Sequence, residues 1–192
     1  MIREFQREKE LKCDSMSEII TFTKIQFDPA SPTAEDINIR DIAHALSFMV
    51  RANGHFPVFY SVGQHCIHCC EEAAARGCTR REQLACLLHD ASEAYLADIT
   101  RPVKQHLEKY REIEQRLQDC IFRKYLGALS EEEKKLWRRL DDTLLYYEFN
   151  CLMGRELKEH PETLISRPVF AAEPFERTER HYLAWFGRLY EE

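Results

Sequence analysis

The sequence predicts one all-α domain, a helical bundle of about six to eight helices. Apolar residues recur with the 3.6-residue period of amphipathic helices from residue 34 onward. Glycine and proline, which interrupt helices, account for only 6 and 7 of the 192 residues. A pattern typical of strands occurs only at residues 18–28, where a short N-terminal β segment is expected. With 44 % apolar and 31 % charged residues, the composition is that of an ordinary globular domain.

The first two helices are expected on either side of the segment Asn-Gly-His-Phe-Pro at residues 53–57. Residues 38–52 place apolar side chains on one face of a helix, and the glycine and proline end it. The second helix is expected to begin near Ser61 and to end at a turn over residues 76–79.

A third helix is expected over residues 79–95. Thr79 is a suitable N-cap, and Glu82, three residues later, completes a capping box. Residues 98–104 are expected to form a loop because Pro102 restricts both itself and the preceding residue.

The C-terminal half is expected to contain three more helices. Residues 106–126 form a long amphipathic pattern. Ser130 and Glu133 make a second capping box, which predicts a helix over residues 131–153. A last helix is expected over residues 174–192.

Charge and hydropathy exclude some partners. The formal net charge of −6 disfavours a broad nucleic-acid-binding surface. No apolar run reaches the eighteen residues of a membrane-spanning helix, and the N-terminus lacks the apolar core of a secretion signal. We therefore expect a cytoplasmic protein with no membrane partner. Residues 1–16 are expected to be a charged extension to a domain at residues 17–192, and Met16 is a candidate start.

The eight cysteines mostly lie within helical apolar pattern, which predicts reduced, buried thiols. Cys66 and Cys69 form one C-x-x-C pair. A structural zinc site would need a second pair at similar spacing, and the sequence has none, so a cysteine-ligated metal is disfavoured.

Two histidines lie at matched positions around the turn near residues 77–78. His65 precedes it and His89 follows it, each by about twelve residues, and equal distances in an antiparallel helix pair give equal height. The two imidazoles can therefore face each other, with Asp90 adding an oxygen. Two imidazoles and a carboxylate suit a transition-metal ion with open positions for water and substrate.

Further acids are expected near these ligands. Asp141 and Asp142 lie among leucines, and an acid on an apolar face must be paired or bound to a metal, so either can supply a fourth ligand. Glu93 lies one helical turn beyond His89 and is expected to share its face and to reach a water at the metal.

Two other histidines are expected to be structural. His68, one turn after His65, is predicted to support the ligands or to pack beside them. His44 is predicted to make a structural hydrogen bond.

The order His65, His89-Asp90, Asp141 resembles the H…HD…D pattern of the HD-domain metal-dependent phosphohydrolase superfamily. Three longer blocks are similar to those of the bacterial 5′-deoxynucleotidases and phage-type HD phosphohydrolases. These blocks are YSVGQH, HDASEAYLADITRPVK and LDDTLLYYE. The resemblance covers residues 20–155.

The resemblance implies a metal site with four ligands, His65, His89, Asp90 and Asp141. Asp141 is preferred to Asp142 because the family's block has a glutamate seven residues on, here Glu148. It implies one divalent ion, with Mn²⁺ or Co²⁺ first and Zn²⁺, Fe²⁺ or Mg²⁺ as alternatives. It also implies a homodimer.

The resemblance further implies that Glu93 positions or activates the attacking water. Asp98 corresponds to an acid at the sugar end of the pocket that recognises the 3′-hydroxyl. The side chains expected to bind the substrate phosphate are Arg51, His55, Arg101 and Lys104.

The expected reaction is hydrolysis of the 5′-phosphate of a deoxynucleoside monophosphate. One alternative keeps the metal site but takes nucleoside di- or triphosphates such as dATP, or guanosine tetraphosphate. The tetraphosphate group carries H-D-x-x-E-D, and Ala94 stands in place of its last acid. An alternative of another class is a non-catalytic nucleotide-binding regulatory module.

Overall fold

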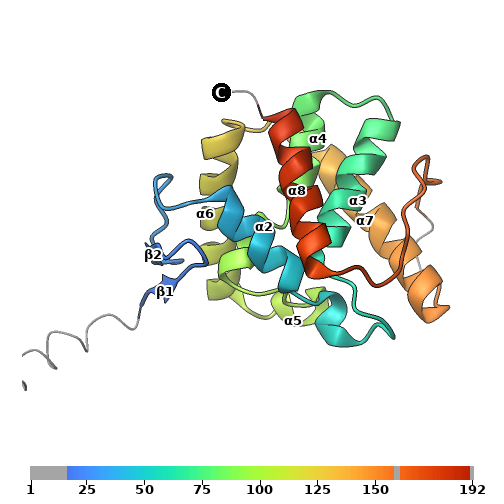
Figure 1. The fold of residues 1–192 in the computed structure, drawn as a ribbon, viewed down its shortest axis with the longest axis horizontal. Helices are drawn as coiled ribbons and strands as arrows, with labels where there is room; N and C mark the ends of the chain where they lie inside the picture. The colour runs from blue at the N-terminus through green and yellow to red at the C-terminus, as the bar shows by residue number, and fades with distance from the viewer. Residues whose placement is uncertain (1–16, 158–160, 191–192) are drawn as a thin grey trace, which may run out of the picture.

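The computed structural model describes residues 17–157 and 161–190, which contain seven α-helices and a two-stranded sheet (Figure 1). The helices are α2 (Ile39–Phe48), α3 (Val62–Ala75), α4 (Arg80–Leu87), α5 (Arg101–Lys104), α6 (Glu108–Tyr125), α7 (Glu131–Met153) and α8 (Phe175–Leu189). Two 3₁₀ helices, η1 (Arg51–Gly54) and η2 (Ala91–Tyr95), follow α2 and α4. The predicted all-α class with a short N-terminal β segment is confirmed. The extension expected at residues 1–16, including Met16, lies outside the described residues.

Helix α3 is the centre of the bundle, because α2, α4, α7 and α8 all pack against it. Figure 1 shows α8 alongside α3 and α4. Every residue from 61 to 70 is buried. Gly63 permits the close approach of α2, since a Cβ there would lie 3.2 Å from the Leu46 carbonyl carbon. Any polar side chain on this part of α3 must therefore find its partners inside the protein.

The helix starts follow the predicted capping chemistry. Thr79 and Glu82 form the expected capping box at α4, and Ser130 and Glu133 form the one at α7. Helix α7 has the predicted bounds, and Gly154 ends it in the left-handed conformation at φ 61°. Ser61 begins α3 with a third capping box.

The prediction of one helix over residues 79–95 is wrong beyond Leu87. In a continuous helix the Cys86 carbonyl would accept from the Asp90 amide, but His89 Nδ1 lies 2.7 Å from that carbonyl oxygen instead. Leu88 and Asp90 leave helical geometry, and 3₁₀ helix η2 follows. A hydrogen bond from a side chain thus takes the place of the next backbone hydrogen bond of the helix.

Two smaller boundaries also differ. The helix predicted over residues 38–52 ends at Phe48, and η1 begins at Arg51 with Ala52 and Asn53 at positive φ. The loop predicted at residues 98–104 contains the one-turn helix α5, in which Pro102 occupies the first turn. Proline is favourable there because the first helical amides need no acceptor within the helix.

The N-terminal sheet pairs β1 (Ile19–Ile20) with β2 (Gln26–Phe27) in antiparallel fashion. Asp41 of α2 holds the intervening turn, since its two carboxylate oxygens accept from the Thr23 amide at 2.6 Å and the Thr23 hydroxyl at 2.8 Å. Phe27 is fully buried against Tyr95 of η2. The sheet is thereby fixed to the segment that follows the His-Asp pair.

The chain between α7 and α8 lies along α3. Glu72 is fully buried and accepts hydrogen bonds from the Ile165 amide, the Ser166 amide and the Ser166 hydroxyl. Further along, Gln64 donates to the Ala171 carbonyl at 3.0 Å. These bonds hold residues 161–171 over the polar face of α3. None of the helices in the described part of the chain is long and apolar enough to span a bilayer.

We expect Glu72→Gln to lower the free energy of unfolding by about 1.5–3 kcal/mol at neutral pH, because a buried charged acceptor of several donors is lost. Burial alone raises the pKa of Glu72, but the bonds from Ser166, Ile165 and Arg76 outweigh it and lower that pKa. The stabilisation is therefore complete above the ordinary value of 4.5 and is lost as the pH falls below it.

Urea unfolding of wild type and variant at several pH values measures this difference. Glu71→Gln is the matched control on the same helix, since Glu71 is 30 % exposed and lies 3.7 Å from its partner His181. The role of Glu72 is contradicted if both variants lose the same free energy of unfolding. It is also contradicted if the difference between wild type and Glu72→Gln grows at low pH.

Candidate metal centre

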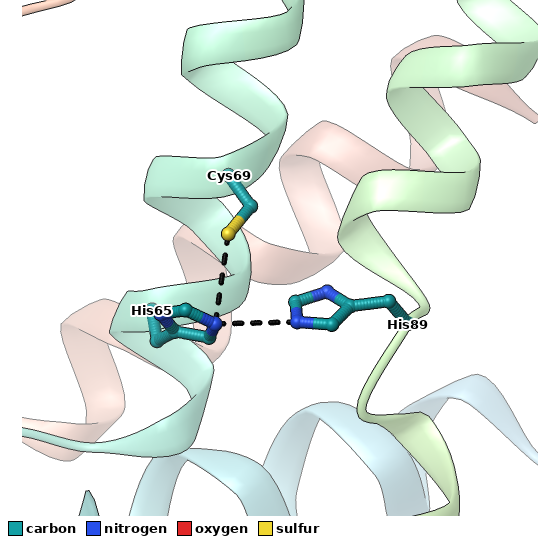
Figure 2. A group of neighbouring side chains, drawn as sticks. All are labelled: His65, Cys69 and His89. Atoms are coloured by element: carbon teal, nitrogen blue, oxygen red, sulfur yellow. Dashed lines mark hydrogen bonds between the residues drawn. The ribbon is translucent and has the colours of Figure 1, made fainter. Parts of the chain in front are cut away.

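Four potential ligand atoms converge between α3, the end of α4 and α7. His65 Nε2 lies 3.2 Å from His89 Nε2 and 3.1 Å from Asp141 Oδ1. Asp90 Oδ2 lies 3.3 Å from His89 Nε2 and 3.8 Å from His65 Nε2. Figure 2 shows the two imidazoles pointing at each other from α3 and from the segment after α4. The structure thus brings together all four side chains that the sequence analysis assigned as ligands.

These spacings fit the donor set of one metal ion. Nitrogen and oxygen ligands bind divalent transition metals at about 2.0–2.2 Å, so neighbouring donor atoms lie about 3.0–3.5 Å apart. The observed separations of 3.1–3.9 Å are close to these values. Two imidazoles and two carboxylates leave coordination positions for water and substrate.

The second nitrogen of each imidazole has an acceptor that fixes the ring. His89 Nδ1 lies 2.7 Å from the Cys86 carbonyl, and His65 Nδ1 lies 2.6 Å from Glu148 Oε1. With the proton on Nδ1, the Nε2 lone pairs of both rings face the cluster. A role for Glu148 in the centre was not predicted from the sequence. Its position seven residues after Asp141, and therefore on the same helix face, was the available signal for a supporting role.

Glu148 is the hub of a buried hydrogen-bond network. It accepts from Arg51 Nε at 2.8 Å and from the Tyr60 hydroxyl at 3.1 Å, in addition to His65. Burial raises the pKa of Glu148, but Arg51 and His65 outweigh it and lower the value to about 2. The Tyr60 hydroxyl also lies 2.8 Å from His68 Nδ1, so His68 supports the network from outside the cluster.

The charges around the cluster favour a cation. Burial raises the pKa values of Asp90 and Asp141, but the facing histidines outweigh this effect and both carboxyls have lowered pKa values. Burial and Arg51 lower the pKa of His65, yet Glu148 and Asp141 raise it to about 9. Positive charge at the His65 Nε2 position is therefore stabilised by its surroundings.

Asp141 and Asp142 have different environments. The Asp141 side chain is 15 % exposed and faces the histidines, whereas that of Asp142 is 59 % exposed. Arg101 bridges them, with Nη2 2.7 Å from Asp141 Oδ2 and Nη1 2.5 Å from Asp142 Oδ1. Between the two acids that the residue pattern left open, Asp141 is the one placed at the cluster.

Glu93 lies beside the cluster with an unsatisfied oxygen. It belongs to η2 rather than to the helix that precedes His89, so the expectation that the two share a helix face is wrong. Its Oε1 contacts Lys104 Nζ at 3.4 Å, while Oε2 is buried with no hydrogen-bond partner among the described residues. Burial, with Asp90 and Asp98 nearby, raises the pKa of Glu93. A water or cation beside Oε2 would satisfy it.

A cavity of about 860 Å³ opens onto the cluster. Its acidic and basic lining residues are Asp90, Glu93, Asp98, Asp141 and Asp142, and Arg51, His55, Arg101, Lys104 and Arg138. An apolar wall includes Ile99, Trp137, Leu145, Phe149 and Leu157. All the residues expected to bind substrate therefore reach one cavity. Arg138 and the apolar wall were not predicted, because they meet at one cavity only once α7 is packed beside α5 and η1.

Two cysteines of α3 lie near the cluster. Cys69 Sγ lies 3.6 Å from His65 Nε2, and Cys66 is close to His89 and Asp90. Figure 2 shows Cys69 beside the two histidines. His44 does not line the cavity; its Nδ1 lies 3.1 Å from Glu179 Oε2 and its ring stacks on Phe22.

The helical fold and the four-donor cluster define a helical domain with side chains that could hold a metal ion. A family model described as HD domain matches residues 59–162, more than half of the chain and all four converging side chains. The chain belongs to the HD domain family. HD domains bind divalent metals and are in general metal-dependent hydrolases, so the family indicates metal-dependent phosphohydrolase chemistry.

Two relatives extend the comparison. The chain is 37 % identical over 110 residues to the uncharacterized protein YfdR of Escherichia coli (strain K12), which covers 57 % of this chain and 59 % of that protein. It is 42 % identical over 102 residues to an uncharacterized protein of Rhodobacter capsulatus, covering 50 % and 52 %. The matched part thus spans somewhat more than half of each relative's length.

We expect Glu148→Gln to weaken metal binding by about 10–100-fold, because the amide no longer holds the His65 tautomer with a charged acceptor. Isothermal titration calorimetry of metal-depleted protein with Mn²⁺ or Co²⁺ measures the dissociation constant. Glu132→Gln, an exposed change in the first turn of the same helix, is the control. Equal affinities for all three proteins would contradict the role of Glu148.

Proposed function

We propose that this protein is a metal-dependent phosphohydrolase that removes the 5′-phosphate of (deoxy)nucleoside monophosphates. The observation that carries the proposal is the convergence of His65, His89, Asp90 and Asp141 beside a cavity that the two aspartates line together with basic side chains. Family membership supports the reaction class, and the motif resemblance supports the nucleotide substrate.

The donor set suits one divalent transition metal, with Mn²⁺ or Co²⁺ as first candidates and Zn²⁺, Fe²⁺ or Mg²⁺ as alternatives. When bound, the ion would lower the pKa of water and neutralise phosphate charge. The residues that would hold it are His65, His89, Asp90 and Asp141. The convergence of their donor atoms supports this assignment.

Glu93 is the proposed general base. Its Oε2 is buried without a hydrogen-bond partner among the described residues, and Glu93 lines the cavity together with Asp90, where it can accept the proton of the attacking water. Lys104 contacts its other oxygen and also lies 2.7 Å from Glu114 Oε1, which holds the pair in place.

Basic side chains around the cavity would bind the phosphate. Arg51 is buried and its guanidinium lies 3.6 Å from both Asp90 and Asp141, so it faces the position where equatorial phosphate oxygens would develop charge. Arg101, with a 60 % exposed side chain, and His55 lie at the outer side. Arg101 and His55 are the proposed entry contacts, and Lys104, which lies beside Glu93, is a further proposed phosphate contact.

The nucleoside would occupy the rest of the cavity. Asp98 lines it, and burial raises the pKa of this carboxyl, which is the proposed acceptor for the sugar 3′-hydroxyl. Trp137, Leu145 and Phe149 provide an apolar surface against which a base can pack.

Nucleoside triphosphates are the second candidate substrates. The cavity of about 860 Å³ is large for a monophosphate, and Arg138 adds a basic group beyond the four that the sequence indicated. Additional phosphates could be bound there without any change at the metal ligands.

The proposed catalytic domain comprises residues 17–192 and acts on small-molecule nucleotides in the cytoplasm. A homodimer stays a prediction from the family resemblance.

We expect phosphate release from deoxynucleoside monophosphates in the presence of Mn²⁺ or Co²⁺, and at least about a 100-fold loss in Asp90→Ala, which removes one ligand. A panel of dAMP, dGMP, dCMP, dTMP, their ribose forms, dATP and guanosine tetraphosphate measures substrate preference. Equal release by wild type and Asp90→Ala would exclude this centre. Nucleotide-induced thermal stabilisation without turnover of any compound would favour the regulatory module.

We expect Glu93→Gln to lower kcat by about 10²–10⁴-fold, because the general base is lost. The dissociation constant for the metal should change by less than about threefold, because Glu93 is not a proposed metal ligand. Steady-state kinetics and metal titration of the same preparation measure both quantities. A Glu93→Gln protein that loses the metal would instead identify Glu93 as a ligand.

A further inference from the structure

Cys69 lies at the metal centre, although it is not among the four assigned ligands. Its Sγ is 3.6 Å from His65 Nε2, and the ligand atoms of His65, Cys69 and His89 all lie within 4.8 Å of one another. All three residues are buried. Figure 2 shows the sulfur pointing toward the same His65 nitrogen that faces His89.

The position of Cys69 follows from helix geometry. Cys69 comes four residues after His65 on α3, so one turn stacks its side chain over the imidazole. In a tetrahedral site with metal–sulfur bonds of about 2.3 Å and metal–nitrogen bonds of about 2.0–2.1 Å, sulfur and nitrogen lie about 3.6 Å apart and two nitrogens about 3.4 Å apart. The observed separations are 3.6 Å and 3.2 Å.

We propose that Cys69 is a further metal ligand, which the centre uses when it binds a thiophilic divalent ion such as Co²⁺, Zn²⁺ or Cd²⁺. The inference rests on the metal centre of the proposed function but not on its nucleotide substrate. On binding, the S–H bond breaks, an S–metal bond forms and the proton passes to solvent, with no change in oxidation state.

This ligand changes which metals the centre prefers. A thiolate is a soft donor that favours Zn²⁺, Cd²⁺ and Co²⁺, whereas carboxylates suit Mn²⁺ and Mg²⁺. The centre can therefore bind hard ions through Asp90 and Asp141 and strengthen its hold on softer ions through Cys69. The ratio of Cd²⁺ to Mn²⁺ affinity becomes a property set by one side chain.

The neighbouring cysteines provide matched comparisons. Cys70 is the next residue on α3 and is fully buried, but it packs in the apolar core that includes Phe27 and Leu46. Cys69 packs in a different cluster, beside Leu140 and Leu144 of α7. Cys66 lies near His89 and Asp90 and is the competing thiol.

The test is a Co²⁺ titration of metal-depleted full-length protein without nucleotide, recorded by absorption spectroscopy. Wild type should show the near-ultraviolet charge-transfer band of a cobalt–thiolate bond, and so should Cys70→Ala and Cys66→Ala. Cys69→Ala should still bind Co²⁺, as its weaker visible bands report, but should lack the charge-transfer band. Circular dichroism establishes that each variant is folded.

Cys69→Ser provides a second measurement if Cys69→Ala does not fold. In Cys69→Ser the ratio of Cd²⁺ to Mn²⁺ affinity should fall at least tenfold by competition calorimetry. A wild-type cobalt complex without the charge-transfer band, a band that persists in Cys69→Ala, or loss of the band in Cys66→Ala would overturn the assignment. Phosphate release with Mn²⁺ is measured separately, so its absence would refute the proposed function and leave this result unaffected.

Discussion

The centre depends on the hydrogen bond between His65 Nδ1 and Glu148 Oε1, 2.6 Å long and fully buried at both ends. It joins α3, the helix at the middle of the bundle, to α7, which carries Asp141. It also directs the His65 Nε2 lone pair toward the other ligands. Because residues 61–70 are all buried, His65 has no access to water and must keep this partner.

The same burial leaves the centre with an excess of negative charge. Asp90, Asp141 and Glu148 contribute three carboxylates, and Arg51, which contacts all of them, contributes one positive charge. Arg101 also contacts Asp141, but its charge is offset by its second partner Asp142. Two negative charges are therefore left to be balanced. Protonated His65 offsets one of them, whereas a divalent cation offsets both. The charge balance therefore favours a divalent ion over a proton at the same position.

Much of the fold could be predicted from local sequence signals. The capping boxes at Thr79 and Ser130 and the bounds of the long helix 131–153 depend on neighbouring residues, which the sequence displays directly. The end of α4 could not be predicted in this way. It depends on the imidazole of His89 lying against the Cys86 carbonyl, and hydrophobic periodicity contains no information about such a side-chain bond.

In the candidate site, too, some features could be predicted from local sequence and others depend on tertiary contacts. The matched positions of His65 and His89 around one turn were sufficient to predict that they face each other. The difference between Asp141 and Asp142 was not predictable from leucine spacing, because it depends on which of the two carboxylates faces His65 once α3 and α7 are packed together. The proposed role of Cys69 could not be predicted from the C-x-x-C pattern, because that pattern indicates sites built from cysteine pairs. The sulfur comes near both histidines only once α3 and the segment after α4 are placed together.

The break after α4 is also what allows adjacent residues to serve one ion. Successive side chains on an α-helix diverge by about 100°, so His89 and Asp90 on a continuous helix could not both point at the same position. With α4 ended at Leu87, His89 Nε2 and Asp90 Oδ2 lie 3.3 Å apart. In the 3₁₀ segment that follows, side chains three residues apart align, which places Glu93 beside Asp90 at the cavity. The local departure from helical geometry therefore creates the arrangement of ligand and base that the helical pattern alone could not provide.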